Sequence, residues 1–539
     1  MPQAISNKRD FWIFMTLNAA LGIAQGLLTI YDLDMSDCIS YIDIAAFYRN
    51  GDWRMALNSY WSPMYSWLLA LLSLVWPADP YFKIAIFKAA NLVALLAAAC
   101  FFDLLVQRLE ARRMLSNDLA WPARLFFVAA NVFAIGVWRD TPDMLLSGFL
   151  YLAVYLALDR SVRGAFATGL ALGAAFLSKA AAMAMVPAFL LCYLKAPRRA
   201  AAFVAGLLLV SAPFVTCLSL EQKRFVISDA GSLNYAWFVT RAATSPHALY
   251  KNEAHNFVHP AQVVISEPQV FLYDGIFKAA TMPTHFFPPY WFAGHANIFD
   301  PVAQAWATGF SLWFYMISFF VYLGIAQLLL VLTGRKVSQS QIVDPLPKIL
   351  LLPAVFGLVA YAVALNMYTP FTIRYVAPFY ALLFIHWLAV MARRYDHPRP
   401  AAFVFVIAFA LYALFSTRSA SVFARLANPD LVNHQAVCAK WLQEDQGVPR
   451  GAKVATLDIP RSPGWAVIGG IRVVADLPDA EAYNADAARL DPALKRVLGE
   501  KGIIGMVAAF LPDGKAPVGG GWVKCPNENF YFLKFASKH

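Results

Sequence analysis

Charged residues are scarce in this 539-residue chain. Asp, Glu, Lys and Arg make up only 14% of it, and 60% of the residues are hydrophobic. A soluble globular protein is about one quarter charged. The deficit argues against an ordinary soluble domain and indicates that lipid is the main solvent of the chain.

A signal-peptide cleavage site and internal repeats are both absent from the sequence. The first apolar run, Phe11–Thr29, lacks the small-residue cleavage site of a signal peptide, so we expect it to be kept as a first membrane span. The chain also shows no internal repeat and no low-complexity tract. Secondary transporters are often built from inverted repeats, so this absence counts against a transporter.

The net charge is +11 and the isoelectric point is about 9.2. The Lys and Arg residues occur in short clusters between apolar runs, which is typical of cytoplasmic loops rather than of a nucleic-acid groove. We therefore predict contact with membrane lipids and no nucleic-acid partner.

A helix needs about 20 apolar residues to cross a membrane. Eleven runs are candidates, some of them short: 11–29, 83–106, 118–137, 144–159, 165–178, 180–194, 201–219, 306–333, 349–366, 373–391 and 401–417. With the N-terminus in the cytoplasm and the C-terminus outside, every basic cluster falls on the cytoplasmic side. The predicted location is a bacterial inner membrane, with residues 1–418 as the membrane domain.

This topology leaves three outer loops, 30–82, 138–143 and 220–304, and an outer tail, 419–539. The tail alternates short strands with helical stretches, and predicts a small α/β domain. It carries no P-loop, no Rossmann glycine fingerprint and no zinc-ligand spacing. Its two cysteines, Cys438 and Cys525, can form a disulfide if the tail is periplasmic.

The first outer loop is predicted to contain a helix from Ser36 to Asn50. Asp37 and Tyr41 are four residues apart and so share one face, whereas Asp43 points in another direction. A second, shorter apolar helix, Met64–Trp76, is expected to lie in the membrane interface. The acidic pair Asp32-x-Asp34 can hold a divalent cation such as Mg²⁺ or Mn²⁺ through oxygen ligands.

Several motifs resemble those of C-type glycosyltransferases, which include protein O-mannosyltransferases and the aminoarabinose transferase of lipid A. The first outer loop is similar through Asp37–Ala45, Gly51–Trp53 and Ser62–Tyr65. The resemblance departs at Cys38, where the family has a second acid, and at Ser40, where it has an Arg. Ser62 replaces a Lys of the aminoarabinose enzymes, so the donor or acceptor can differ from theirs.

Later segments continue the resemblance in chain order to about residue 420. They are Trp138–Leu146, Leu177–Lys179 and Arg374–Pro378, and between the last two of these Ser228–Trp237 and His285–Trp291, which are similar to segments of uncharacterised bacterial members. The resemblance implies an all-α polytopic membrane fold with about eleven helices. It also implies an inverting transferase that takes a sugar from a polyprenyl-phosphate donor to a lipid, glycan or protein acceptor.

The resemblance also suggests roles for individual residues. Asp37 is the candidate general base. Lys179, Arg374 and Arg139 are candidates to bind the donor phosphate. Candidates for binding the acceptor, or for orienting it or a metal, are Asp143, Asp140 and Tyr41. Candidate platforms for lipid or sugar are Tyr235, Trp237, Tyr290 and Trp291.

Each assignment has a plainer alternative. Arg139 and Arg374 can snorkel at span ends, and the acids can be solvated loop charges. The aromatic residues can form an interfacial belt. For the whole chain, the alternatives are an oligosaccharide ligase or polymerase and, from another class, a secondary transporter or lipid flippase. Large outer segments favour a transferase.

Overall fold

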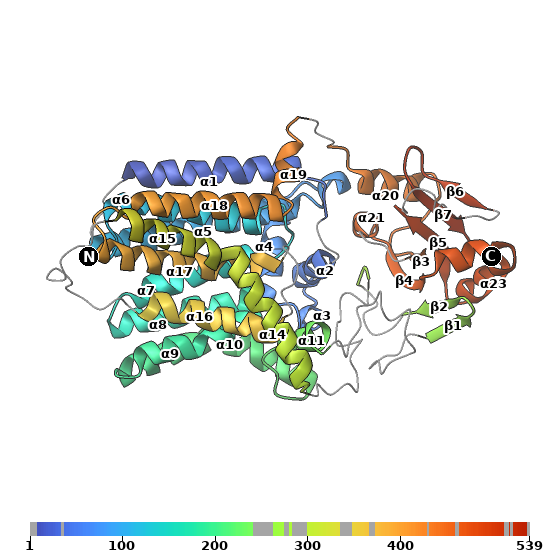
Figure 1. Cartoon of the computed structure of the whole chain (residues 1–539). Helices are drawn as coiled ribbons and strands as arrows, with labels where there is room; N and C mark the ends of the chain where they lie inside the picture. Colours follow the sequence, from blue (N-terminus) through green and yellow to red (C-terminus); the bar gives the residue numbers. More distant parts are fainter. Residues whose placement is uncertain are drawn as a thin grey trace.

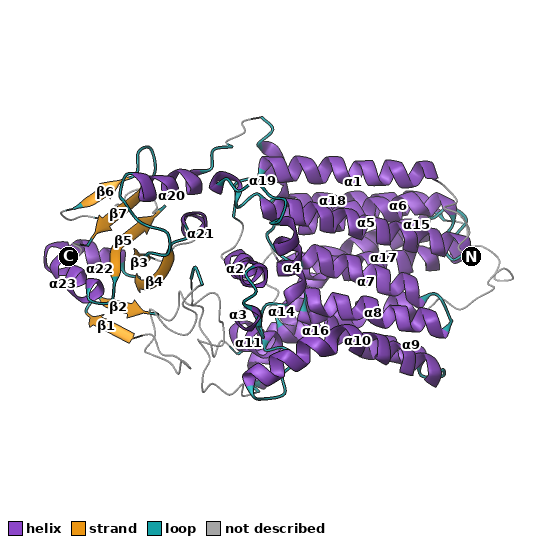
Figure 2. Cartoon of the chain, turned by 180° about the vertical axis from the view of Figure 1, so that it is seen from behind, coloured by secondary structure: helices purple, strands orange, loops and turns teal. Residues whose placement is uncertain are grey.

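The structure, a computed structural model, combines a bundle of long helices with a part that contains a β-sheet (Figure 1). The start of the first helix and the sheet lie at opposite ends of the molecule (Figures 1 and 2). The described residues are 8–33, 37–240, 262–273, 280–282, 299–334, 348–365, 372–427, 431–458, 463–510, 517 and 521–535.

Each of the eleven predicted spans coincides with a helix or with consecutive helical segments. These are α1 (Lys8–Leu28), α5 (Ile86–Ala111), α6 (Asn117–Phe127) with η2 (Val128–Ile135), α7 (Asp143–Ala157), α8 (Val162–Ser178), η3 (Ala180–Met185) with α9 (Val186–Tyr193), α10 (Pro197–Gln222), α14 (Pro301–Tyr315) with η5 (Met316–Phe320) and α15 (Val321–Thr333), α16 (Lys348–Ala364), α17 (Ile373–Arg394) and α18 (Arg399–Ser416). Within the described residues, seven helices are long and apolar enough to cross a membrane. The chain is a multi-pass membrane protein, and the count of eleven spans stays a prediction.

Helices α8 and α10 pack at backbone contact because glycines face each other's backbone. A Cβ added to Gly169 would lie 2.0 Å from the carbonyl oxygen of Phe203, and one added to Gly206 would lie 2.2 Å from that of Phe166. Small residues at helix crossings allow this close approach inside a membrane.

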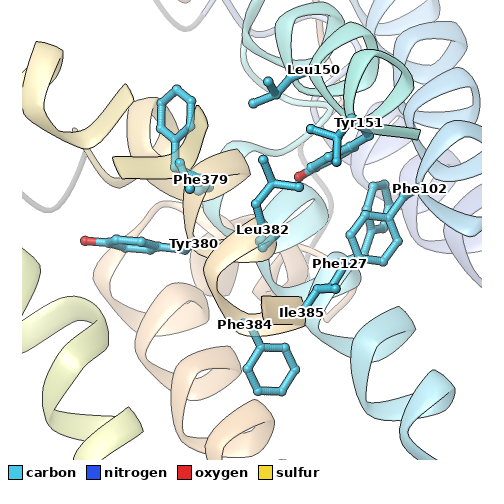
Figure 3. Packing of buried hydrophobic residues seen from close by; sticks show 14 of the residues in the cluster. Phe102, Phe127, Leu150, Tyr151, Phe379, Tyr380, Leu382, Phe384 and Ile385 are labelled. Atoms are coloured by element: carbon cyan, nitrogen blue, oxygen red, sulfur yellow. The ribbon is translucent and has the colours of Figure 1, made fainter. Parts of the chain in front are cut away.

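Aromatic side chains fill the centre of the bundle (Figure 3). The ring of Phe102 lies 4.9 Å from that of Phe127 and 5.0 Å, edge to face, from that of Tyr151. The Tyr380 hydroxyl is 2.8 Å from the Ser318 hydroxyl, so its buried polar end has a hydrogen-bond partner.

Three short helices follow α1: α2 (Asp37–Arg49), α3 (Trp53–Ala56) and α4 (Pro63–Leu72). The turn after α2 contains Gly51 at φ +77°, a conformation that favours glycine. The Asp52 carboxylate then caps α3 by accepting a hydrogen bond from the Met55 amide. The predicted helix over 36–50 is thus present, and it lies between the bundle and the sheet (Figures 1 and 2).

The sheet has seven strands in the order β1-β2-β4-β3-β5-β7-β6. Its strands are β1 (Gln262–Ser266), β2 (Gln269–Leu272), β3 (Lys453–Leu457), β4 (Arg472–Leu477), β5 (Ile503–Ala509), β6 (Trp522–Lys524) and β7 (Phe530–Lys534). The three central strands, β4, β3 and β5, are parallel, and helices α21 (Gly464–Gly469), α22 (Ala480–Ala485) and α23 (Ala487–Gly499) lie in the connections between them. The predicted α/β tail is confirmed.

The hairpin of β1 and β2 comes from the predicted outer loop 220–304 rather than from the tail. Strand β2 pairs antiparallel with β4, at Phe271 opposite Asp476 and Leu272 opposite Ala475. The sheet therefore joins two segments about 200 residues apart in the sequence.

One apolar cluster connects the first outer loop to the tail. It contains Cys38 and Ile39 of α2, Trp465 of α21 and Phe530 of β7. Trp465 packs edge-on against Phe530 with ring centroids 5.5 Å apart. Burial of shared apolar surface thus fixes α2 against the sheet-bearing part.

Cys438 and Cys525 lie side by side in this cluster. Cys438 is on α20 (His434–Glu444), and both cysteines are buried free thiols, close enough for each to affect the pKa of the other. Two contacts hold α20 beside the β6–β7 turn: His434 Nδ1 lies 2.5 Å from Glu528 Oε1, and the Trp441 ring lies 6.1 Å from that of Phe530.

We expect diamide to join Cys438 to Cys525 in the purified protein, faster at pH 9 than at pH 7. Burial raises the pKa of both thiols, so the reactive thiolate becomes more abundant as the pH rises. Peptide mapping without reduction would show the cross-linked peptide, and Cys438→Ser should abolish it. Recovery of both cysteines as separately alkylated peptides would contradict this prediction.

Candidate active site

Three charged residues meet from the ends of three helices. Asp143 is the first residue of α7, and Arg374 lies in the first turn of α17. Lys179 follows α8 in an extended conformation, while its amide still donates to the carbonyl of Ala175 at 2.8 Å. Lys179 therefore lies at the point where the helical hydrogen bonding ends, and its side chain projects from the end of α8.

The Asp143 carboxylate binds both cations. It forms an ion pair with the Lys179 ammonium, and its Oδ2 lies 3.6 Å from Arg374 Nε. Thr141 donates to the same Oδ2 at 2.8 Å. Asp143 and Arg374 are buried, whereas the Lys179 side chain is 24% exposed. Two cations from different helices thus share one carboxylate.

Tyr375 supports the two cations. Its ring centroid is 4.2 Å from Lys179 Nζ and 4.7 Å from Arg374 Cζ, within the range of cation–π attraction. Its hydroxyl accepts a hydrogen bond from the Arg374 guanidinium at 2.8 Å. Tyr361 of α16 stacks on it, with ring centroids 5.4 Å apart. The positions of both cations are thus fixed before any ligand arrives.

Asp37, the first residue of α2, shares this region. Burial raises the pKa of Tyr41 and Tyr60 well above the usual value, and the charge of Asp37 raises both further. Arg374 lowers both of these pKa values, and Asp143 raises that of Tyr41. Because Tyr41 senses all three charges and Tyr60 senses those of Asp37 and Arg374, the carboxylate of α2 lies in one electrostatic neighbourhood with the cation site.

Arg139 and Asp140 lie in a second cluster. Lys88 of α5 pairs with Asp140 at 2.5 Å and donates to the carbonyl oxygen of Trp138 at 2.8 Å. The Arg139 guanidinium carbon lies 4.3 Å from the centroid of the Trp138 ring. All these side chains are buried, so this cluster holds the second outer loop in place.

The predicted aromatic platform is described only in part. Tyr235 is half-buried on α11 (Ala230–Phe238), which begins beside Ser59, because the Asp229 amide donates to the Ser59 carbonyl at 2.8 Å. Trp237 lies on the same helix, but its side chain is not among those that the structure describes. Tyr290 and Trp291 also lie outside the described residues.

The divalent cation suggested by Asp32-x-Asp34 stays a prediction. Across the described ranges, no group of three or more His, Cys, Asp or Glu side chains is close enough to hold a metal ion. The Asp32 carboxylate lies 2.9 Å from both Arg418 and Arg425, and Asp34 lies outside the described residues.

No family model and no curated protein matches the chain in sequence. Among solved structures, it resembles ArnT from Cupriavidus metallidurans bound to undecaprenyl phosphate, with a TM-score of 0.54 and 13% identity over 98% of each chain. The structure of ArnT in the apo state gives a TM-score of 0.50 and 14% identity, again over 98% of each chain. The chain has the C-type glycosyltransferase fold. At this identity the likeness establishes the fold alone.

The C-type fold brings together Asp37, Tyr41, Asp143, Lys179 and Arg374, all of them candidates from the sequence. Residues that the sequence analysis did not select complete the site. Tyr375 directly follows Arg374, so the Arg-Tyr motif contained the necessary signal. Tyr60 and Tyr361 come from segments with no such motif, and only the packing of the helices identifies them.

We expect Lys88→Met to lower the melting temperature strongly. The substitution removes the ammonium that pairs with the buried Asp140 carboxylate, a loss on the order of 3–5 kcal/mol. Replacing both partners, as in Lys88→Met with Asp140→Leu, should restore much of the stability. Tryptophan fluorescence during heating in detergent would measure this, and equal melting temperatures for the wild type and the single variant would contradict it.

Proposed function

We propose that the protein transfers a sugar from a polyprenyl-phosphate donor to a hydroxyl group of an acceptor, with inversion at the anomeric carbon. One observation carries the proposal. A carboxylate, Asp37, lies in one electrostatic neighbourhood with two cations, Lys179 and Arg374, which Asp143 and Tyr375 hold in place. Such a site suits a reaction that removes a proton at one end and releases a phosphate at the other.

In this mechanism Asp37 acts as the general base. The acceptor oxygen forms a bond to the anomeric carbon while its proton passes to the Asp37 carboxylate. The bond between that carbon and the phosphate oxygen breaks, and the bonding electrons leave with the lipid phosphate. A single displacement of this kind inverts the anomeric centre.

Lys179 and Arg374 stabilise the negative charge that develops on the leaving phosphate. The guanidinium can bind phosphate through two hydrogen bonds, and the ammonium acts as a point charge. Before the donor binds, Asp143 forms ion pairs with both cations. Tyr375 keeps them in position, so donor binding requires little rearrangement of the site.

The fold supports the proposed donor class. ArnT, which shares the C-type fold, binds undecaprenyl phosphate. We propose that this chain also binds a polyprenyl phosphate and that it works in a bacterial inner membrane, with the C-terminus periplasmic. The transferred group would be a hexose or a pentose, and the acceptor a lipid, a glycan or a protein.

Mass spectrometry of surface glycans and glycolipids from a deletion strain tests the function directly. The proposal expects the loss of one sugar residue from one class of molecule. Loss of a whole oligosaccharide would favour a ligase or polymerase, and an unchanged set of glycans would reject the transferase.

Asp37→Asn is expected to reduce transfer roughly 100- to 10,000-fold, the usual contribution of a general base. The amide keeps the shape of the side chain but cannot take up the proton. Restoration of the lost glycan in the complemented deletion strain measures transfer, and binding of undecaprenyl phosphate by the purified variant should not change. Full restoration would remove Asp37 from the role of base.

Arg374→Ala is expected to weaken binding of undecaprenyl phosphate by at least about tenfold, since a hydrogen bond to a charged group contributes about 1.5–3 kcal/mol. Titration calorimetry in detergent measures the affinity. Arg425, whose side chain is paired with Asp32, provides a matched control, and Arg425→Ala should leave the affinity unchanged. Equal losses in both variants would argue against a specific phosphate contact.

A further inference from the structure

Helix α2 carries a second carboxylate, Asp43, on a different face from Asp37. Both oxygens of Asp43 accept hydrogen bonds from Thr281: one from the backbone amide at 2.8 Å and one from the hydroxyl at 2.8 Å. Two donors from one residue fix the carboxylate plane as well as its position. Nothing in the proposed transfer reaction uses this contact.

Thr281 is itself attached to the sheet. Its carbonyl oxygen accepts a hydrogen bond from the amide of Val473 in β4 at 2.8 Å. Its neighbours Ala280 and Met282 are buried in the apolar cluster that contains Ile39 of α2. A continuous path of hydrogen bonds therefore runs from α2 through Thr281 to the centre of the sheet.

Lys83 is the charged group that faces Asp43. Its ammonium donates to the carbonyl oxygen of Val467 in α21 at 2.5 Å, and its own neighbours include the cations Arg49 and Arg450. Burial raises the pKa of Asp43 from 3.8 to about 6, against the opposing effects of the Thr281 hydrogen bonds and Lys83. Burial likewise lowers the pKa of Lys83, against the effect of Asp43.

We propose that Asp43 is a positioning residue: through Thr281 it holds α2 against the sheet and so fixes the position of Asp37 near the cation site. The claim that Asp43 positions Asp37 for catalysis rests on the proposed function, whereas the claim that it attaches α2 to the sheet does not. The sheet then contributes to catalysis by holding α2 in place, although it supplies no reacting group.

The attachment should depend on pH. When α2 leaves the sheet, Asp43 regains its ordinary pKa, so the attached form binds a proton more tightly between about pH 4 and pH 6. The attached form is therefore most favoured at low pH, and this advantage is lost as the pH rises through about 6. An asparagine at position 43 can keep both contacts with Thr281 and removes the titration.

Hydrogen exchange of α2 amides in the full-length protein tests the attachment without any turnover. We expect Asp43→Ala to speed exchange of amides in 37–49 at least tenfold, and Thr281→Val, which removes only the hydroxyl contact, to have a smaller effect. Asp43→Asn should match the wild type at low pH and keep that protection as the pH rises, once the intrinsic pH dependence of amide exchange is subtracted. Asp491, a buried acid that accepts from Tyr483 at 2.5 Å, is the matched control, and Asp491→Ala should leave α2 unchanged.

The same variants test positioning in the complemented deletion strain. Asp43→Ala should lower the restored glycan at least tenfold and change the affinity for undecaprenyl phosphate less than twofold, and Asp43→Asn should rescue the glycan. Unchanged exchange in both Asp43→Ala and Thr281→Val overturns the attachment. Faster exchange with full glycan restoration overturns the positioning role. If the wild type restores no glycan, the proposed function fails, and exchange still decides the attachment.

Discussion

The site depends on one carboxylate that holds two cations. Asp143 binds Lys179 and Arg374 where the ends of α7, α8 and α17 meet. Buried cations next to a membrane are costly without partners, and two of them close together would repel each other. The Asp143 carboxylate offsets this repulsion, and the ring of Tyr375 attracts both cations as well. Three separate helix ends can therefore converge on one point.

Helix α2 connects this site to the sheet. The residue at its start, Asp37, shares the electrostatic environment of the cations, and Asp43 bonds to Thr281 beside β4. The sheet is completed by a hairpin from the loop before α14, so the two parts of the chain are interlocked rather than merely adjacent. A shift of the sheet would therefore be transmitted to α2.

Two residues at which the sequence departs from the C-type motifs that it resembles, Cys38 and Ser40, are both buried on α2. Cys38 lies in the apolar cluster that α2 shares with the sheet-bearing part, where an acid would need its own partner. The packing of α2 thus favours a small, weakly polar side chain at this position.

Sequence alone determined the elements of the fold. Hydrophobic run lengths located the helices of the bundle, and period-two strands separated by helical stretches identified the α/β tail, because these signals are local in the chain. The motifs also contained the five residues that meet at the site. Tertiary structure decided which candidates belong together, and it assigned Asp140 to Lys88 and Asp143 to Lys179.

Only the folded chain could show that β1 and β2 join a sheet formed by residues about 200 positions later, or that Thr281 binds Asp43. Short strands and single hydrogen bonds carry no periodic signal. Their partners are chosen by the packing of distant segments, and this packing is a property of the whole chain rather than of any one stretch of sequence.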